Sequence, residues 1–176
     1  MMQVNVNSPV IRLMQATDLN QVMAIQLTCY SAAYHEALSV LQQRFNCSPQ
    51  TAWVAVDEHG VGGYLVAYVS SFGKVTALHS SFACTGQPDT LYIHDLAIDP
   101  RLGGQGVAAR LIQTAFETAQ TKHLRGLALV AVQDSTRFWR RHGFAPLALA
   151  TPQQQANLAV YGAAAVYLYA DVIEAL

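Results

Sequence analysis

The chain has 176 residues, of which 52% are hydrophobic and 12% are charged, and its formal net charge is −1. This length predicts a single domain, residues 1–176, that buries about 70% of the surface exposed by its unfolded chain. The near-zero charge excludes a global electrostatic attraction to nucleic acid or to an acidic membrane surface.

No apolar run reaches the roughly 18 uninterrupted residues of a membrane span. Met1–Asn5 also lacks the basic start and apolar block of a signal peptide. We therefore expect a cytoplasmic protein without a membrane or nucleic-acid partner. Cys29, Cys47 and Cys84 are odd in number and widely separated, which favours reduced, buried thiols over disulfides or a zinc site. No bound metal is expected.

The N-terminal segment predicts a strand followed by two helices. Val10 to Met14 alternates in polarity and should form the first strand. Thr17-Asp18 offers a cap for a helix that runs toward Cys29, and a second helix is expected from Ala32 to about Phe45. The expected inner face of this second helix carries Leu38, Leu41 and Phe45.

A hairpin and a long connection should follow. Thr51 to Val56 and Val61 to Ser70 are strand-like runs, and the short loop Asp57–Gly60 between them suits an antiparallel hairpin. Ser71 to Asp89 has mixed polarity and no sustained period, so it is predicted to be a long connection. Connections of this length are often functional.

The middle of the chain predicts a strand, a glycine loop, a helix and a second strand. Leu91 to Ile98 reads as a largely buried strand, which Asp99-Pro100 ends. From Val107 an apolar stripe recurs at helical spacing. Gly126 to Val132 then suits a buried parallel strand, which completes a βαβ unit.

The glycine loop has the composition of a phosphate site. Gly103, Gly104 and Gly106 lie beside Arg101, directly before the helix that begins near Val107. A helix start leaves backbone N–H groups unpaired at the positive end of the helix dipole, and the missing Cβ atoms let a ligand approach closely. Three glycines and an arginine in one short loop favour phosphate binding over a simple tight turn.

Gly104–Ala109 also fits the loose dinucleotide pattern G-x-G-x-x-A, which would predict a Rossmann fold. Two features argue against it. Asp99-Pro100-Arg101 separates the glycines from the strand, and the expected acid about 20 residues later is missing from the run Leu127 to Val132.

Two segments carry a resemblance to the GNAT superfamily of N-acetyltransferases. Arg101–Gly106 resembles its acyl-CoA loop signature [QR]-x-x-G-x-[GA], and Ser135–Phe144 resembles its A-x-x-F-Y-x-x-x-G-F segment, expected here as a short helix closed by Gly143. The likeness runs in order from about Val10 to a last strand, Val166 to Val172. It implies an α/β (α+β) fold with a mixed central β-sheet flanked by helices and a βαβ acyl-CoA-binding core.

By this resemblance acetyl-CoA is the acyl donor and an amine is the acceptor; homodimerisation is left open. The backbone of the central strand would pair with the pantetheine arm, and one of its N–H groups would polarise the thioester carbonyl. Tyr30, Tyr34, His35 and Glu36 could face the acceptor. The residues expected to bind acetyl-CoA are Leu96, Ala97, Ile98, Arg101, Leu102, Gly103, Gly104, Gln105, Gly106, Val107, Ser135, Phe138 and Trp139.

An amine with a pKa near 10.4 is mostly protonated at neutral pH, so the reaction needs a base. Strict alternation along the strand would put Tyr92, His94, Leu96 and Ile98 on one face, with Asp95 on the other unless a bulge intervenes. Several family members place a Glu or His at the position of Tyr92 or His94. His94 is the favoured base, and Asp95 is the competing choice.

Trp139 stands where many family members have a tyrosine that is assigned as the acid for the departing thiolate. Indole N–H does not titrate in this range, so that role is not carried over. A thiol with a pKa near 8.5 leaves readily without an acid. Tyr161 and Tyr167, in the returning segment Gln153–Tyr169, are the candidate replacements.

Together these features predict an N-acetyltransferase that acts directly on a small-molecule or peptide amine. The rival from another class is a non-catalytic acyl-CoA-binding sensor or structural module. The tryptophan favours the rival, whereas the strand histidine favours the enzyme.

Overall fold

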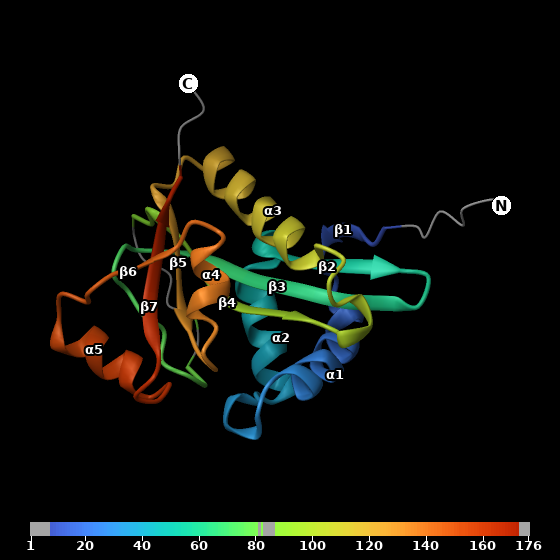
Figure 1. Ribbon diagram of the computed structural model, residues 1–176, viewed down its shortest axis with the longest axis horizontal. Coiled ribbons are helices and arrows are strands. Elements are labelled where there is room, and N and C mark those ends of the chain that lie inside the picture. The colour runs from blue at the N-terminus through green and yellow to red at the C-terminus, as the bar shows by residue number, and fades with distance from the viewer. Residues whose placement is uncertain (1–7, 81, 83–86, 173–176) are drawn as a thin grey trace.

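The computed structural model describes residues 8–80, 82 and 87–172 (Figure 1). Met1–Asn5 and Cys84, on which two expectations depend, lie outside the described residues. Cys29 and Cys47 are free thiols, and Cys47 is exposed, not buried as expected. No helix in the described part of the chain is long and apolar enough to cross a membrane.

In the described ranges, seven strands form one mixed sheet in the order β1-β2-β3-β4-β5-β7-β6. Of the strand pairs described there, β4–β5 is parallel and the others are antiparallel. The strands are β1 (Val10–Leu13), β2 (Ala52–Asp57), β3 (Gly60–Ser70), β4 (Thr90–Ile98), β5 (Gly126–Ala131), β6 (Ala145–Pro146) and β7 (Val166–Asp171). This confirms the predicted hairpin, central strand and βαβ unit.

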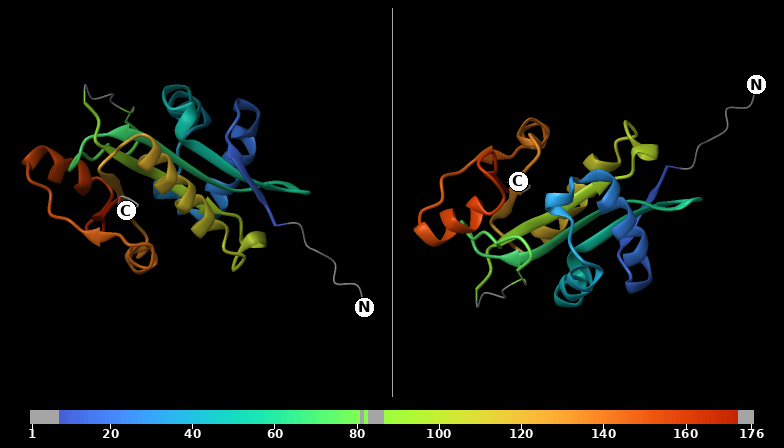
Figure 2. Two further views of the ribbon diagram at one scale, coloured as in Figure 1. Left: turned by 90° about the horizontal axis from the view of Figure 1, so that it is seen from above. Right: turned by 90° about the horizontal axis from the view of Figure 1, so that it is seen from below.

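Helices cover both faces of the sheet (Figure 2). The described α-helices are α1 (Leu19–Cys29), α2 (Leu38–Cys47), α3 (Val107–Thr121), α4 (Thr136–Arg140) and α5 (Pro152–Ala159). The α3 and α4 side chains share one core with one face of the sheet, and α1, α2 and the end of α5 pack in a second core on the other face. The α3 stripe is the one expected from its period, with Leu111 and Ala115 fully buried.

Three local expectations differ from the structure. The second helix was expected from Ala32, but Ala32–Tyr34 forms a 3-10 turn and α2 begins only at Leu38. Leu38, expected on the inner face, is 41% exposed because it lies in the first turn. Asp18 does not cap α1 with its side chain; its carboxylate instead accepts two hydrogen bonds from Arg12 at 2.7 and 2.9 Å.

Helix α5 and strand β6 were not predicted. The sequence features that favour α5 are confined to its N-terminus. The Thr151 side chain accepts a hydrogen bond from the Gln154 N–H, and Pro152 occupies the first turn. The helix has no buried residue, so it lacks the apolar stripe on which a sequence-based prediction depends. Strand β6 has two residues, and only its pairing with β7 defines it.

Two irregularities of β4 create the space for a site. First, β4 pairs with β5 only from Thr90 to Ile93, so its second half has no neighbour on that side. Second, Val66 pairs with Asp95 while Ala67 pairs with Ile93, which leaves His94 as the extra residue of a bulge. Both His94 and Asp95 therefore contact side chains on the α1/α2 face.

The bulge corrects the expected alternation. Asp95 shares a face with Tyr92 and His94, whereas Leu96 and Ile98 pack against the α3 core. The expectation that Leu96 and Ile98 share a face with His94 is wrong, because one extra residue reverses the side-chain direction of all later positions.

Candidate active site

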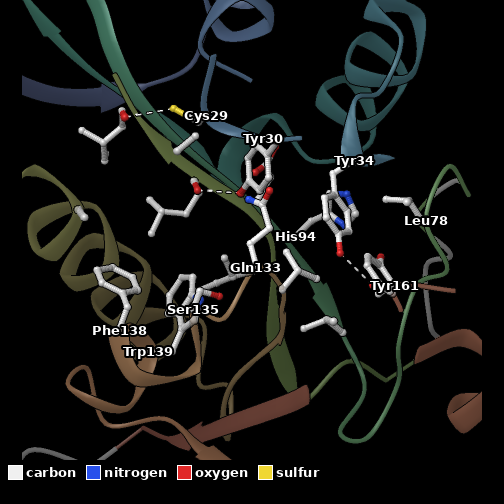
Figure 3. Close-up of a pocket in the computed structure, with 18 of the residues that line it drawn as sticks. Cys29, Tyr30, Tyr34, Leu78, His94, Gln133, Ser135, Phe138, Trp139 and Tyr161 are labelled. Carbon is white, nitrogen blue, oxygen red and sulfur yellow. Dashed lines mark hydrogen bonds between the residues drawn. The ribbon is translucent and has the colours of Figure 1, made fainter. Parts of the chain in front are cut away.

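A cavity of about 320 Å³ opens where β4 and β5 separate (Figure 3). Its walls come from the end of α1 and the turn after it, the second half of β4, the end of β5, and α4. Its lining includes Tyr30, Tyr34, Glu36, Leu78, His94, Asp95, Gln133 and Tyr161 at one part, and Leu96, Ala97, Ile98, Ala108, Ser135, Phe138 and Trp139 at another. Segments far apart in sequence thus share one cavity.

The glycine loop adopts backbone conformations that only glycine takes easily. Gly104 and Gly106 have φ angles of 74° and 73°, and Gly106 occupies the N-cap of α3. A Cβ atom at either position would meet open space within 4 Å. The first N–H groups of α3 have no partner inside the helix, so the loop presents donors and a positive dipole end to an uncovered surface.

Arg101, expected to contact the phosphates, lies elsewhere in this structure. Its guanidinium pairs with Asp57 at the β2–β3 turn, and one nitrogen lies 3.3 Å from the Gly60 carbonyl. Another nitrogen lies 3.7 Å from Asp99. Arg101 thus ties the glycine loop to the hairpin, and its charge is already paired. Leu102 is buried, and Gln105 donates to the Arg101 carbonyl at 3.2 Å.

The free side of β4 presents backbone donors to the cavity. The Tyr30 hydroxyl donates to the Leu96 carbonyl at 2.9 Å, and the Cys29 thiol donates to the Ile98 carbonyl at 3.2 Å. On the opposite side, the Asp99 N–H donates to Gly62 of β3 at 2.9 Å. Because the N–H and C=O of one strand residue point to the same side, the Leu96 and Ile98 N–H groups face the gap that β5 leaves.

The aromatic residues of α4 form the floor of this half of the cavity. Phe138 and Trp139 meet edge to face with ring centroids 5.1 Å apart, and Trp139 also contacts Phe144 at 5.4 Å. Trp139 is only 7% exposed and belongs to the α3-side core. Its indole therefore packs as a core residue while one part of it lines the cavity.

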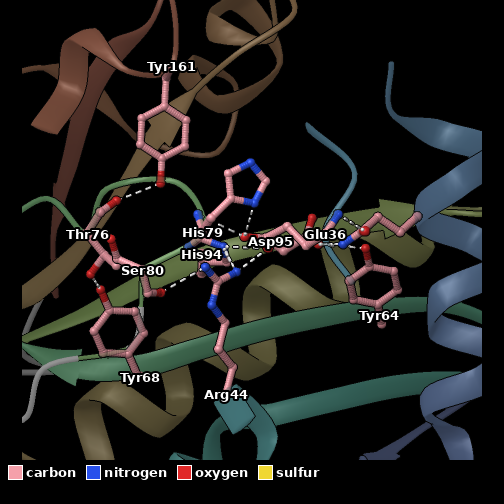
Figure 4. A network of polar contacts seen from close by, with 11 residues as sticks. Glu36, Arg44, Tyr64, Tyr68, Thr76, His79, Ser80, His94, Asp95 and Tyr161 are labelled. Carbon is pink, nitrogen blue, oxygen red and sulfur yellow. Dashed lines mark hydrogen bonds and ion pairs between the residues drawn. The ribbon is translucent and has the colours of Figure 1, made fainter. Parts of the chain in front are cut away.

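His94 belongs to a buried charge network with Glu36 and Arg44 (Figure 4). The Arg44 guanidinium contacts both the Glu36 carboxylate and His94 Nε2, and it donates to the Ser80 carbonyl at 3.0 Å. The same His94 Nε2 lies 3.3 Å from Glu36 Oε2, so this ring nitrogen faces both the guanidinium and the carboxylate. Among the described residues, Nδ1 is buried without a hydrogen-bond partner.

Glu36 is held ionised in this network. Burial raises the pKa of its carboxyl group, but the hydrogen bond and charge of His94 and the charge of Arg44 outweigh burial and lower the pKa to about 2. The side chains of Glu36 and Arg44 are 3% and 2% exposed. This ion pair is thus almost fully desolvated, which makes each partner depend on the other.

Asp95 has a different environment. Its carboxylate accepts from the Tyr64 hydroxyl at 2.6 Å and from Gln26 Nε2 at 3.4 Å. Gln26 also receives the Glu36 N–H on its Oε1 at 2.9 Å, so one α1 side chain positions both acids. Within the described ranges, no lysine, arginine or histidine forms an ion pair with Asp95.

The candidate tyrosines occupy three different situations. Tyr161 lines the cavity, but its hydroxyl donates to the Thr76 carbonyl at 2.6 Å, and burial raises its pKa. Tyr167 does not line the cavity; its hydroxyl accepts from the Gly73 N–H at 3.1 Å, and burial raises its pKa to about 12. Tyr92 is 1% exposed in the α1-side core, where burial raises its pKa strongly.

Several site residues were missed or misplaced by sequence reasoning. Arg44 pairs with Glu36, Tyr64 donates to Asp95, and Gln26 contacts both acidic residues. In the sequence, nothing distinguishes these three residues from other residues of a helix or strand. Gln133 lines the cavity with a φ of 51°, and its Oε1 accepts the Ser31 N–H at 3.1 Å, which joins β5 to the turn after α1. Of the four expected acceptor residues, His35 does not line the cavity; its Nε2 lies 2.7 Å from the Tyr30 carbonyl.

A family model described as "Acetyltransferase (GNAT) family" matches residues 19–144, so the chain belongs to this family. The resemblance stated from the glycine loop and the α4 segment is thereby confirmed. A search of curated protein sequences finds no match to this chain.

Solved structures agree on the fold. The GNAT-like decarboxylase GphF in complex with isobutyryl-CoA has a TM-score of 0.75 at 16% identity, covering 93% of this chain and 100% of that one. Ard1 from Thermoplasma volcanium has a TM-score of 0.71 at 17% identity, covering 95% and 99%. The ribosomal-protein-S18-alanine N-acetyltransferase from Escherichia coli has a TM-score of 0.66 at 12% identity, covering 95% and 96%. The chain has the GNAT fold.

Proposed function

We propose that this protein is an N-acyltransferase that moves an acyl group, acetyl in the first instance, from acyl-CoA directly to an amine. The observation that carries the proposal is the cavity between the separated strands β4 and β5, which is lined by Ala108, two residues after the glycine loop, and by the side chains of Glu36 and Asp95. Family membership supports the acyltransfer chemistry.

The donor half fits acyl-CoA in two respects. Gly104 and Gly106 leave open space at the start of α3, where a pyrophosphate would meet N–H groups and the helix dipole. The N–H groups of Leu96 and Ile98 face the gap beside β4, where they can pair with pantetheine. One of them can also stabilise the negative charge that develops on the thioester oxygen.

In the proposed reaction the amine nitrogen attacks the thioester carbon, the C–S bond breaks, and CoA leaves as a thiolate. The amine loses one proton to a base. His94, the base favoured from sequence, has Nε2 occupied by the Arg44 guanidinium, whereas Asp95 has only neutral hydrogen-bond donors. These contacts favour Asp95 as the proton acceptor, with His94 holding the ion pair beside it.

The decisive assay measures thiol release from acetyl-CoA against a panel of small amines, polyamines and peptide N-termini. Amine-dependent release with formation of the amide is expected. The rival, a non-catalytic acyl-CoA-binding module, predicts that acetyl-CoA raises the melting temperature while no amine is acylated. A thermal shift with NAD and none with acetyl-CoA or CoA would contradict both readings.

A further inference from the structure

We propose that the acceptor is a small organic cation: a primary amine with an apolar body and no acidic group, whose ammonium pairs with Asp95. This rests on the proposed function and names the acceptor class for the same cavity. Three features carry it, namely the charges that line the cavity, the hydrogen bonds that hold Asp95, and the aromatic rings in the cavity lining.

The cavity wall is negative. Among the described residues that line it, the charged side chains are Glu36 and Asp95, with His94 between them and no lysine or arginine. Arg44 neutralises Glu36 from behind the wall, where it does not line the cavity. One uncompensated carboxylate therefore remains, and it matches one ammonium group.

Asp95 is fixed in place before any ligand arrives. The bulge at His94 turns it toward the α1/α2 face, and Tyr64 and Gln26 hold one of its oxygens (Figure 4). Both donors are neutral, so they orient the carboxylate without pairing its charge. A positioned carboxylate in a partly buried wall gains most from a cation that it can contact directly.

Tyr30, Tyr34 and Tyr161 also line the cavity, and they offer it aromatic rings, not free hydroxyl groups (Figure 3). The hydroxyls of Tyr30, Tyr34 and Tyr161 donate to the backbone carbonyls of Leu96, Tyr161 and Thr76, at 2.9, 3.0 and 2.6 Å. Their rings and Leu78 therefore form an apolar surface. Such a surface suits a hydrocarbon body and attracts a nearby cation through the ring faces.

These features disfavour an amino acid as the acceptor. A free carboxylate on the acceptor would lie among Glu36, Asp95 and aromatic rings, and no described lysine or arginine lines the cavity to receive it. A buried, unpaired carboxylate is strongly unfavourable. The size of the cavity, about 320 Å³ shared with the thioester end of the donor, also favours a small amine body.

The test compares two amines with the amino acids that differ from them by one carboxylate: 2-phenylethylamine with phenylalanine, and 3-methylbutylamine with leucine. Each is assayed for acetyl transfer from acetyl-CoA, and separately for a melting-temperature shift of the CoA-saturated protein. We expect each amine to exceed its amino acid by at least tenfold in kcat/KM, and only the amines to raise the melting temperature.

The variant arm uses Asp95→Asn, which keeps the shape of the side chain. We expect the melting-temperature shift with the amines to be lost and their KM to rise at least tenfold. Turnover should fall as well, because the same carboxylate is the proposed base. The thermal shift with CoA should be unchanged. The control is Glu117→Gln on the exposed face of α3, which removes one negative charge outside the cavity and should leave the KM for amines unchanged.

Equal or better use of the amino acids would overturn the acceptor assignment and leave the proposed function standing. Thermal shifts with the amines but no acetyl transfer would support the acceptor assignment and sink the proposed function. Absence of both binding and transfer for all four compounds would overturn the assignment. An unchanged KM for amines in Asp95→Asn would likewise remove Asp95 as the anchor.

Discussion

The buried Glu36–Arg44 pair makes a stability prediction whose size follows from the structure. The perturbation is Glu36→Gln, which leaves the Arg44 guanidinium buried beside a neutral amide. Removing the charge of one partner of a buried ion pair typically lowers the unfolding free energy by about 3–5 kcal/mol, because the other charge stays desolvated and uncompensated.

The pKa of Glu36 gives an independent magnitude. Its lowering from 4.5 to about 2, in which His94 and Arg44 outweigh burial, corresponds to about 3.4 kcal/mol of unfolding free energy at pH 7. The folded-state pKa lies below that of the unfolded chain, so this stability is present in full above pH 4.5. It is lost as the pH falls toward 2, and about 1.4 kcal/mol remains at pH 3.

The assay is urea unfolding of the wild type and of Glu36→Gln at pH 7 and pH 3. The difference in unfolding free energy should be about 3 kcal/mol at pH 7 and should shrink by about 2 kcal/mol at pH 3. Glu58→Gln is the matched control, because that glutamate side chain is 87% exposed, and it should change stability little at either pH. A Glu36→Gln deficit below 1 kcal/mol, or one that is equal at both pH values, would refute the argument.

Three further predictions concern the cavity. Gly104→Glu should abolish the melting-temperature shift with acetyl-CoA by adding bulk and negative charge, whereas Gly104→Asn, which tolerates a positive φ, should retain it; equal shifts in both variants would place CoA elsewhere. Tyr161→Phe should lower turnover by about tenfold or less and leave its pH dependence unchanged, because the hydroxyl already donates to Thr76; a large loss that grows at low pH would make Tyr161 the acid. His94→Ala should lower stability as well as turnover, since it removes one partner of Arg44; a large rate loss that shrinks at high pH, with stability unchanged, would restore His94 as the base.

The sequence by itself determined the order of most elements, α5 and β6 excepted, and it pointed to the glycine loop before α3. The spacing of apolar residues that marks a helix or a strand is a local pattern, visible within a short stretch of sequence. The strands β4 and β5 and the start of α3 could therefore be predicted close to their observed positions. The glycine loop was readable for the same reason. Positive φ angles at Gly104 and Gly106 are a local requirement that only a few residue types meet.

Only the tertiary structure decided the acceptor half. Whether Asp95 faces the cavity depends on the register of β4 against β3, and the bulge at His94 reverses the expected alternation. The partner of Glu36 is an arginine on the next helix, and the hydrogen-bond donor to Asp95 is a tyrosine on a neighbouring strand.

For Arg101, the sequence predicted the position in the glycine loop, but only the tertiary structure showed which charge it pairs with. Its place in the glycine loop was readable from spacing, but its charge pairs with Asp57, 44 positions earlier in the chain. Contacts of this kind arise from the packing of whole elements, and residue types alone do not specify which of several available charges will meet. The loop that we propose to bind the donor is therefore encoded locally, while the position of the carboxylate that we propose to select the acceptor is set by how β3, β4, α1 and α2 pack together.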